Sequence, residues 1–112
     1  MAGRVREIDD RDFMGEVLEA PELVVVDFWA PWCGPCRAMA PVLETLAGRF
    51  PDQVKVVKIN VDVNPVWASE LAVRGIPALF FFQGGQPVDG VVGYQAETAL
   101  VQRVEGLLRP AA

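Results

Sequence analysis

The sequence predicts an α/β domain built on a mixed five-stranded sheet flanked by four helices, and three observations support this class. Apolar, strand-like runs alternate with stretches of helical periodicity along most of the chain, a pattern typical of strand–helix–strand units with parallel pairing. A Gly-Gly pair separates two further strand-like runs near the C-terminus, which predicts an antiparallel hairpin. The 112 residues, 52% of them hydrophobic, suffice for one compact domain that spans residues 1–112.

The first half of the chain is expected to form two strands and two helices. Residues 5–8 can form a short strand, and Asp9 or Asp10 can cap a helix that ends near residue 19. Residues 23–30 are almost continuously apolar, as expected for a strand that is buried on both faces. Residues 34–50 are predicted to form the second helix, with an apolar stripe made of Cys36, Met39, Ala40, Leu43, Leu46, Ala47 and Phe50.

The second half is expected to add three strands and two helices. Residues 54–62 predict a strand, and the Asn-Pro pair that follows marks the start of a helix that ends near residue 73. Residues 78–82 and 87–92 predict the two strands of the hairpin. A C-terminal amphipathic helix is marked by the apolar residues Leu100, Val101, Val104, Leu107 and Leu108.

The composition narrows the range of functions. The formal net charge is −5 and no block of basic residues stands out, which argues against nucleic acid and anionic membranes as partners. The N-terminal segment lacks the apolar stretch of a secretory signal, and no apolar run approaches the roughly 20 residues of a membrane helix. We therefore expect a cytoplasmic protein. The absence of histidine excludes Ser-His and Cys-His nucleophilic sites and histidine-ligated zinc or haem.

Cys33 and Cys36 are the only cysteines of the chain and lie in the stretch VDFWAPWCGPCRAMAP, residues 25–40. As a structural staple the pair is poorly placed, because a disulfide that closes so short a ring contributes only about 2 kcal/mol. A closed zinc site needs four ligands. With no histidine and no third cysteine, a metal would have to bridge two chains.

A redox role explains more of the pattern. The thiolate is the reactive form of cysteine, and the positive end of a helix dipole stabilises it. Cys33 directly precedes the predicted helix, and Cys36 lies in its first turn on the apolar stripe. We therefore expect Cys33 to be the attacking thiolate, and Cys36 to be the more buried, resolving thiol.

WCGPC following VDFWA, with KINVD and GIPALFFF further on, closely resembles the thioredoxin family from about residue 8 to the last helix. The resemblance implies the thioredoxin fold and a thiol–disulfide oxidoreductase that reduces protein disulfides through a redox-active Cys33–Cys36 pair. Gly34 and Pro35 would tune the relative stability of its dithiol and disulfide forms. The implied partners are disulfide-containing proteins and, as electron donor, a thioredoxin reductase; we expect a monomer without cofactor or metal.

Residues outside the motif also match the family. Asp27 interrupts an apolar strand, so burial should raise its pKa; by resemblance it exchanges a proton with Cys36, whereas the plainer alternative is an aspartate that reaches solvent. Lys58 would tune Asp27, or would simply be solvated. The Ile76–Pro77 bond is expected to be cis, against a frequency of only about 5–6% for X–Pro bonds in folded proteins. The expected substrate surface consists of Trp32, Gly75, Ile76, Pro77, Val92 and Gly93.

The chain departs from the familiar family pattern at four positions. Ala78 follows Pro77 where a threonine is usual, and Arg37 replaces the common lysine after the motif. Tyr94 and Trp67 add aromatic bulk. These residues bear on partner preference and reduction potential rather than on the exchange chemistry.

Two other functions remain compatible with the sequence. The same fold can act as an oxidase or isomerase, although Gly-Pro between the cysteines argues against this, and a measured reduction potential would decide. A non-catalytic binding subunit would use the fold only for docking. Its partner binding would survive the substitution Cys33→Ser.

Overall fold

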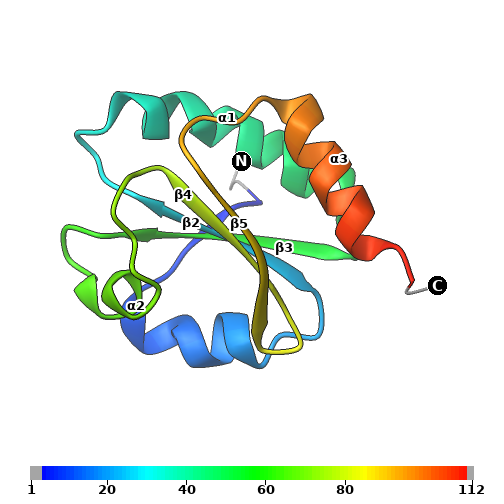
Figure 1. The fold of residues 1–112 in the computed structure, drawn as a ribbon, viewed down its shortest axis with the longest axis horizontal. Coiled ribbons are helices and arrows are strands. Elements are labelled where there is room, and N and C mark those ends of the chain that lie inside the picture. The colour runs from blue at the N-terminus through cyan, green and yellow to red at the C-terminus, as the bar shows by residue number, and fades with distance from the viewer. Residues whose placement is uncertain (1–3, 111–112) are drawn as a thin grey trace.

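The computed structural model describes residues 4–110 and contains one five-stranded sheet in the order β1-β3-β2-β4-β5 (Figure 1). Strands β2 and β1 each pair with β3 in parallel, whereas β4 pairs antiparallel with both β2 and β5. The sheet is therefore mixed, as the sequence predicted. The strands are β1 (Arg6–Glu7), β2 (Leu23–Trp29), β3 (Val54–Asn60), β4 (Ala78–Gln83) and β5 (Gln86–Val92).

Helices cover both faces of the sheet. Helices α1 and α3 lie on one face, while α2 and the first helical segment, η1 and η2, lie on the other (Figure 1). In the described part of the chain, no helix is long and apolar enough to cross a membrane. The helical elements are η1 (Asp10–Asp12), η2 (Met14–Leu18), α1 (Gly34–Arg49), α2 (Pro65–Glu70) and α3 (Glu97–Leu108).

Three local features differ from the sequence-based expectations. The first helix is a 3-10 turn that continues into a π-helical segment, not an α-helix. Helix α2 ends at Glu70, short of residue 73, because Ala72 adopts a left-handed conformation with φ of 54°. The Val73 N–H then donates to the Ala68 carbonyl at 2.8 Å, which closes the last turn. Ala40, placed on the buried stripe by its spacing, is exposed.

The alternation of side chains along β2 divides the core into two layers. Leu23 and Val25 pack toward α1 and α3, whereas Val24 and Val26 pack toward η2 and α2. Because strand side chains alternate with a period of two, Asp27 projects from the same face as Leu23 and Val25. A carboxyl group is thus placed beneath α1.

The ends of three strands meet at one edge of the sheet. Phe28 near the end of β2 pairs with Ala78 at the start of β4, and Ala78 pairs with Val92 at the end of β5. The loop that follows β2, the residue that precedes β4 and the loop that follows β5 therefore lie together. This edge is where α1 begins.

Asp10 joins the first helical segment to α2. Its carboxylate accepts hydrogen bonds from the Val66 N–H at 3.0 Å and the Trp67 N–H at 3.2 Å, two first-turn amides that have no partner within the helix. Its own N–H donates to Asn64 Oδ1 at 2.9 Å. The Phe13 ring stacks on Trp67 with 4.2 Å between centroids.

The substitution Asp10→Ala should lower the free energy of unfolding by about 1 kcal/mol, the usual cost of losing a side-chain cap. The measurement is urea denaturation followed by circular dichroism. Asp52→Ala, at an exposed turn position, is the matched control and should change the free energy by less than about 0.5 kcal/mol. Equal effects of the two substitutions would contradict the capping role of Asp10.

Candidate active site

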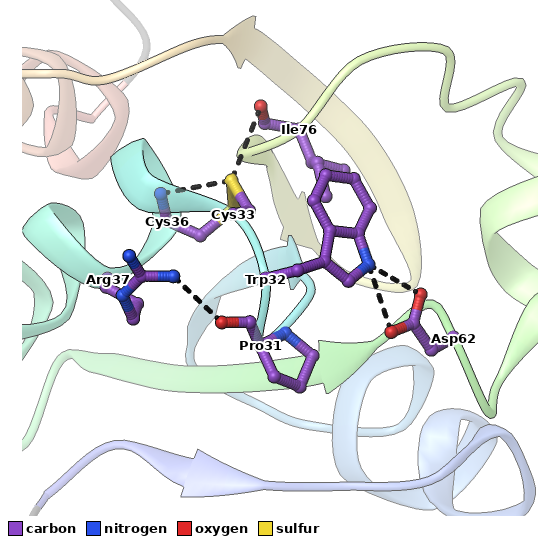
Figure 2. The surroundings of a disulfide bond; sticks show 7 residues. All are labelled: Pro31, Trp32, Cys33, Cys36, Arg37, Asp62 and Ile76. Atoms are coloured by element: carbon purple, nitrogen blue, oxygen red, sulfur yellow. Dashed lines mark hydrogen bonds between the residues drawn. A yellow bond between two sulfur atoms is a disulfide. The ribbon is translucent and has the colours of Figure 1, made fainter.

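The two cysteines lie at the N-terminus of α1. Cys33 is the N-cap residue, with extended backbone angles (φ −88°, ψ 111°), and Pro35 occupies the first turn, where its missing N–H costs nothing. Cys33 and Cys36 form a disulfide with 5.2 Å between their Cα atoms. The Cys36 N–H donates to Cys33 Sγ at 3.2 Å (Figure 2). A backbone donor at a helix N-terminus favours negative charge on that sulfur.

The two cysteines differ in their surroundings more than in their burial. In the disulfide form Cys33 is 5% exposed and Cys36 is 3% exposed, so the expected difference in burial is small. The Ile76 carbonyl oxygen lies 3.9 Å from Cys33 Sγ (Figure 2). Cys36 instead lines a cavity of about 180 Å³ together with Asp27. One sulfur thus contacts a loop at the sheet edge, and the other adjoins the cavity that Asp27 also lines.

Hydrogen bonds made by two side chains, Trp32 and Arg37, fix the segment that precedes the cysteines. Trp32 is 69% exposed, and its Nε1 donates to both carboxylate oxygens of Asp62 at 3.1 Å. The Arg37 guanidinium donates to the Pro31 carbonyl at 2.9 Å (Figure 2). No role was predicted for Asp62 from the sequence. Its signal was an acidic residue two positions after the end of β3, which ends at this edge.

The two loops opposite the cysteines are joined to each other. The Ile76–Pro77 peptide bond is cis, and the Pro77 carbonyl accepts a hydrogen bond from the Gly93 N–H at 2.7 Å. Gly93 has a φ of 93°, in the left-handed region that favours glycine. A Cβ atom on Gly75 would lie 3.3 Å from Val92 Cγ1. The structure therefore brings together the loop residues that the resemblance assigned to substrate binding.

Asp27 is buried beneath α1, with 2% of its surface exposed. Its Oδ1 has no hydrogen-bond partner within residues 4–110. Burial raises the pKa of this carboxyl from the usual 3.8 to about 7, with Lys58 acting to lower it and Glu7 to raise it. The cavity that Asp27 shares with Cys36 is lined by apolar as well as charged side chains, and its volume of about 180 Å³ has room for several water molecules.

Lys58 and Trp29 lie beside this cavity and also line it. Lys58 is paired with Asp27 in the register of β2 and β3, and its Nζ lies 4.6 Å from the centroid of the Trp29 ring. The Trp29 Nε1 donates to Glu7 Oε2 at 3.0 Å. Glu7 was not singled out in the sequence, because it lies in a polar N-terminal segment without a motif.

The chemistry available to this arrangement is thiol–disulfide exchange. A reversible disulfide lies at a helix N-terminus, a protonatable carboxyl lies behind it, and exposed backbone and apolar groups lie in front. The fold and the site together define a thiol–disulfide oxidoreductase.

Comparison with known proteins agrees with this class. The family model for thioredoxin matches residues 4–106. Thioredoxin 1 of Nostoc sp. (strain PCC 7120) is 50% identical over 99 residues, which cover 88% of this chain and 92% of that protein. Thioredoxin 1 of Synechococcus elongatus is 51% identical over 98 residues, with the same coverage. The bifunctional thioredoxin reductase/thioredoxin of Mycobacterium leprae is 46% identical over 101 residues, 90% of this chain and 22% of that protein.

The chain belongs to the thioredoxin family. It is a protein-disulfide reductase that acts by dithiol–disulfide exchange. Disulfide-containing proteins are its substrates and a reductase is its partner, as the family membership implies.

The raised pKa of Asp27 predicts a particular pH dependence of stability. Because the pKa in the folded state is above that in the unfolded state, the stability contributed by protonated Asp27 is fully present below pH 3.8 and is lost as the pH rises through about 7. Relative to Asp27→Asn, the wild type should lose as much as about 4 kcal/mol across this window.

Guanidinium denaturation of the oxidised proteins at pH 4, 6 and 8 measures this loss. The exposed substitution Asp52→Asn is the control, and its difference from wild type should be nearly constant with pH. A constant difference for Asp27→Asn would show that the carboxyl is not perturbed.

Proposed function

We propose that Cys33 is the nucleophile and Cys36 the resolving thiol of the reductase. The Cys33 thiolate attacks one sulfur of a substrate disulfide, so the substrate S–S bond breaks, a mixed disulfide forms, and the leaving sulfur takes up a proton. The Cys36 thiolate then attacks Cys33 Sγ, which releases the second substrate sulfur and leaves the Cys33–Cys36 disulfide. The observation that carries this assignment is the hydrogen bond from the Cys36 N–H to Cys33 Sγ at the N-terminus of α1.

Asp27 accepts the proton that Cys36 must lose before it can attack. The shared cavity supports a route through water, and a pKa of about 7 suits a group that both accepts and returns a proton near neutral pH. Lys58, on the neighbouring strand, tunes this carboxyl, because a nearby ammonium favours the ionised form.

Gly34 and Pro35 tune the reduction potential. They form the whole of the segment between the two cysteines, so their conformational preferences act directly on the balance between dithiol and disulfide. For this two-electron couple, a change of about 30 mV corresponds to about 1.4 kcal/mol. Small backbone effects in this segment therefore decide whether the protein reduces or oxidises its partners.

An extended substrate segment binds across Trp32 and the two loops opposite the cysteines. Trp32 and Val92 are largely exposed apolar side chains, and the Ile76 backbone lies next to Cys33, where it can pair with a substrate strand. The small residues of this surface suit shallow docking of many proteins. The binding residues are Trp32, Gly75, Ile76, Pro77, Val92 and Gly93.

The reductase partner is a thioredoxin reductase. The relative from Mycobacterium leprae is named as a fusion of both activities, which supports this electron donor. We further propose that residues 1–112 form one domain that acts as a monomer in the cytoplasm. The net charge of −5 favours neither nucleic acid nor anionic membranes as partners.

Insulin reduction tests the roles of the two cysteines. Cys33→Ser should abolish activity, and Cys36→Ser should stop turnover while trapping a one-to-one mixed disulfide through Cys33, because the resolving attack is lost. Mass spectrometry of the trapped species identifies the linked cysteine. An adduct on Cys36 in the Cys33→Ser variant would reverse the assignment.

Asp27→Ala should leave the first attack nearly unchanged and slow the release of the mixed disulfide by about 100-fold at pH 7, the lower end of the contribution of general base catalysis. Single-turnover kinetics with a fluorescent disulfide separate the two steps. Asp52→Ala is the control and should alter neither. Unchanged release by Asp27→Ala would remove the carboxyl from the proton transfer.

A further inference from the structure

Glu7 has no role in the proposed function. The pairing of strands β1, β3 and β2 places it in line with Asp27. Glu7 of β1 is paired with Lys58 of β3, and Lys58 is paired with Asp27 of β2. Side chains paired in this way project from the same face of the sheet, which here is the face covered by α1. The three side chains form a row in which one ammonium lies between two carboxyl groups.

Trp29 connects the two ends of this row. It lies two residues after Asp27 on β2, so its indole projects from the same face, and its Nε1 donates to Glu7 Oε2 at 3.0 Å. The Lys58 Nζ lies over the indole, 4.6 Å from the ring centroid, in a cation–π contact. Among the residues that the structure describes, Lys58 forms no ion pair with Glu7 or Asp27. The ring face therefore holds the ammonium.

We propose that Glu7 is a positioning residue for proton transfer: by holding the Trp29 indole, it keeps the Lys58 ammonium over the ring and away from the Asp27 carboxyl. An ammonium free to approach a buried carboxyl would stabilise the ionised form and weaken it as a base. The Glu7 carboxylate also repels negative charge at Asp27 directly. Both effects favour a carboxyl that can take the proton of Cys36, so the inference rests on the proposed role of Asp27.

Two other charged groups face Asp27, both from α1. Arg37 and Glu44 line the same cavity. Arg37 donates to the Pro31 carbonyl, and Glu44 accepts hydrogen bonds from backbone N–H groups just before β1. Because Arg37 and Glu44 are each held by backbone groups, a substitution at Glu7 leaves both in place. Its effect on Asp27 therefore reports only the influence of Glu7 and of Lys58.

Two substitutions separate the charge of Glu7 from its hold on the indole. Glu7→Gln removes the charge but keeps an oxygen that can accept from Trp29 Nε1, whereas Glu7→Leu removes both. The titration of the Asp27 carboxyl carbon is followed by nuclear magnetic resonance in the oxidised protein, a measurement that requires no activity.

Glu7→Gln should lower the titration midpoint of Asp27 by about half a pH unit. This is the shift expected from charges about 10 Å apart, two strand spacings, at an effective dielectric constant of about 50. It amounts to about a threefold change in the ratio of protonated to ionised carboxyl. Glu7→Leu should lower the midpoint further, because Lys58 is released from its position over the ring.

In a Lys58→Met background, the difference between Glu7→Leu and Glu7→Gln should vanish. Glu105→Gln, which removes one exposed charge on α3, is the matched control and should leave the midpoint unchanged. Equal midpoints for the two Glu7 variants, or a difference that persists without Lys58, would overturn the proposal.

The pH profile of mixed-disulfide release distinguishes this inference from the proposed function. In each Glu7 variant, the pH profile of release should shift by the same amount as the titration midpoint of Asp27. If the midpoint moves and the profile does not, Glu7 still positions Lys58, but Asp27 is not the base.

Discussion

The first backbone amides of helix α1 have no partners within the helix, and one of them, from Cys36, donates to the sulfur of Cys33. The reactivity of the site depends on this contact, because it supplies a fixed partial positive charge where a sulfur anion must form. Other features keep it in place. Pro35 occupies the first turn without an N–H of its own, and Arg37 ties the helix back to the preceding loop. Fixed groups around the start of α1 thus hold the sulfur of Cys33 in place.

The carboxyl of Asp27 has the opposite character, since its burial destabilises the ionised protein. It lies on the face of β2 that packs against α1, with one oxygen lacking a partner in the described residues. Burial of this kind is tolerated at functional sites when the surrounding structure is stable enough to carry it. Here β2 is central in the sheet, with β3 and β4 on its two sides, so the strand that carries the strained group is also firmly held.

The sequence predicted the parts of the structure that depend on local pattern. The continuous apolar run of β2, the periodicity of α1 and the Gly-Gly hairpin led to a fold class that the structure and the family match confirm. The first helical segment was predicted as a regular helix. Asp9, one of the two expected caps, is its N-cap residue. The side chain of Asp10 instead serves the amides of α2, a contact that no short-range pattern encodes. Likewise, no residue near Ala72 indicated a left-handed conformation, because the residue that usually marks one at the end of a helix is glycine.

The same distinction applies to the site. The cysteine pair and Asp27 were singled out because a motif and a charge in an apolar strand can be recognised from the sequence alone. The cis bond before Pro77 was expected only through the family resemblance, since frequency alone favours trans. Glu7 and Asp62 contact tryptophans 22 and 30 residues away, so their roles follow from strand register and side-chain direction. Strand register and side-chain direction are properties of the folded sheet and cannot be read from a local sequence pattern.

The positions of Cys33 and Cys36 also separate the transfer of electrons from the transfer of protons, both of which thiol–disulfide exchange requires. The sulfur of Cys33 lies beside the Ile76 backbone, which is part of the proposed substrate surface, whereas Cys36 adjoins the cavity that Asp27 also lines. In the proposed mechanism, electrons enter or leave through Cys33, and protons leave on the side of Cys36 that faces Asp27. In that mechanism the separation orders the steps, because Asp27 can deprotonate Cys36 without competing with the helix amide that already stabilises Cys33. A base on the outer side would instead be exposed to each docking protein, and its proton affinity would change with every substrate.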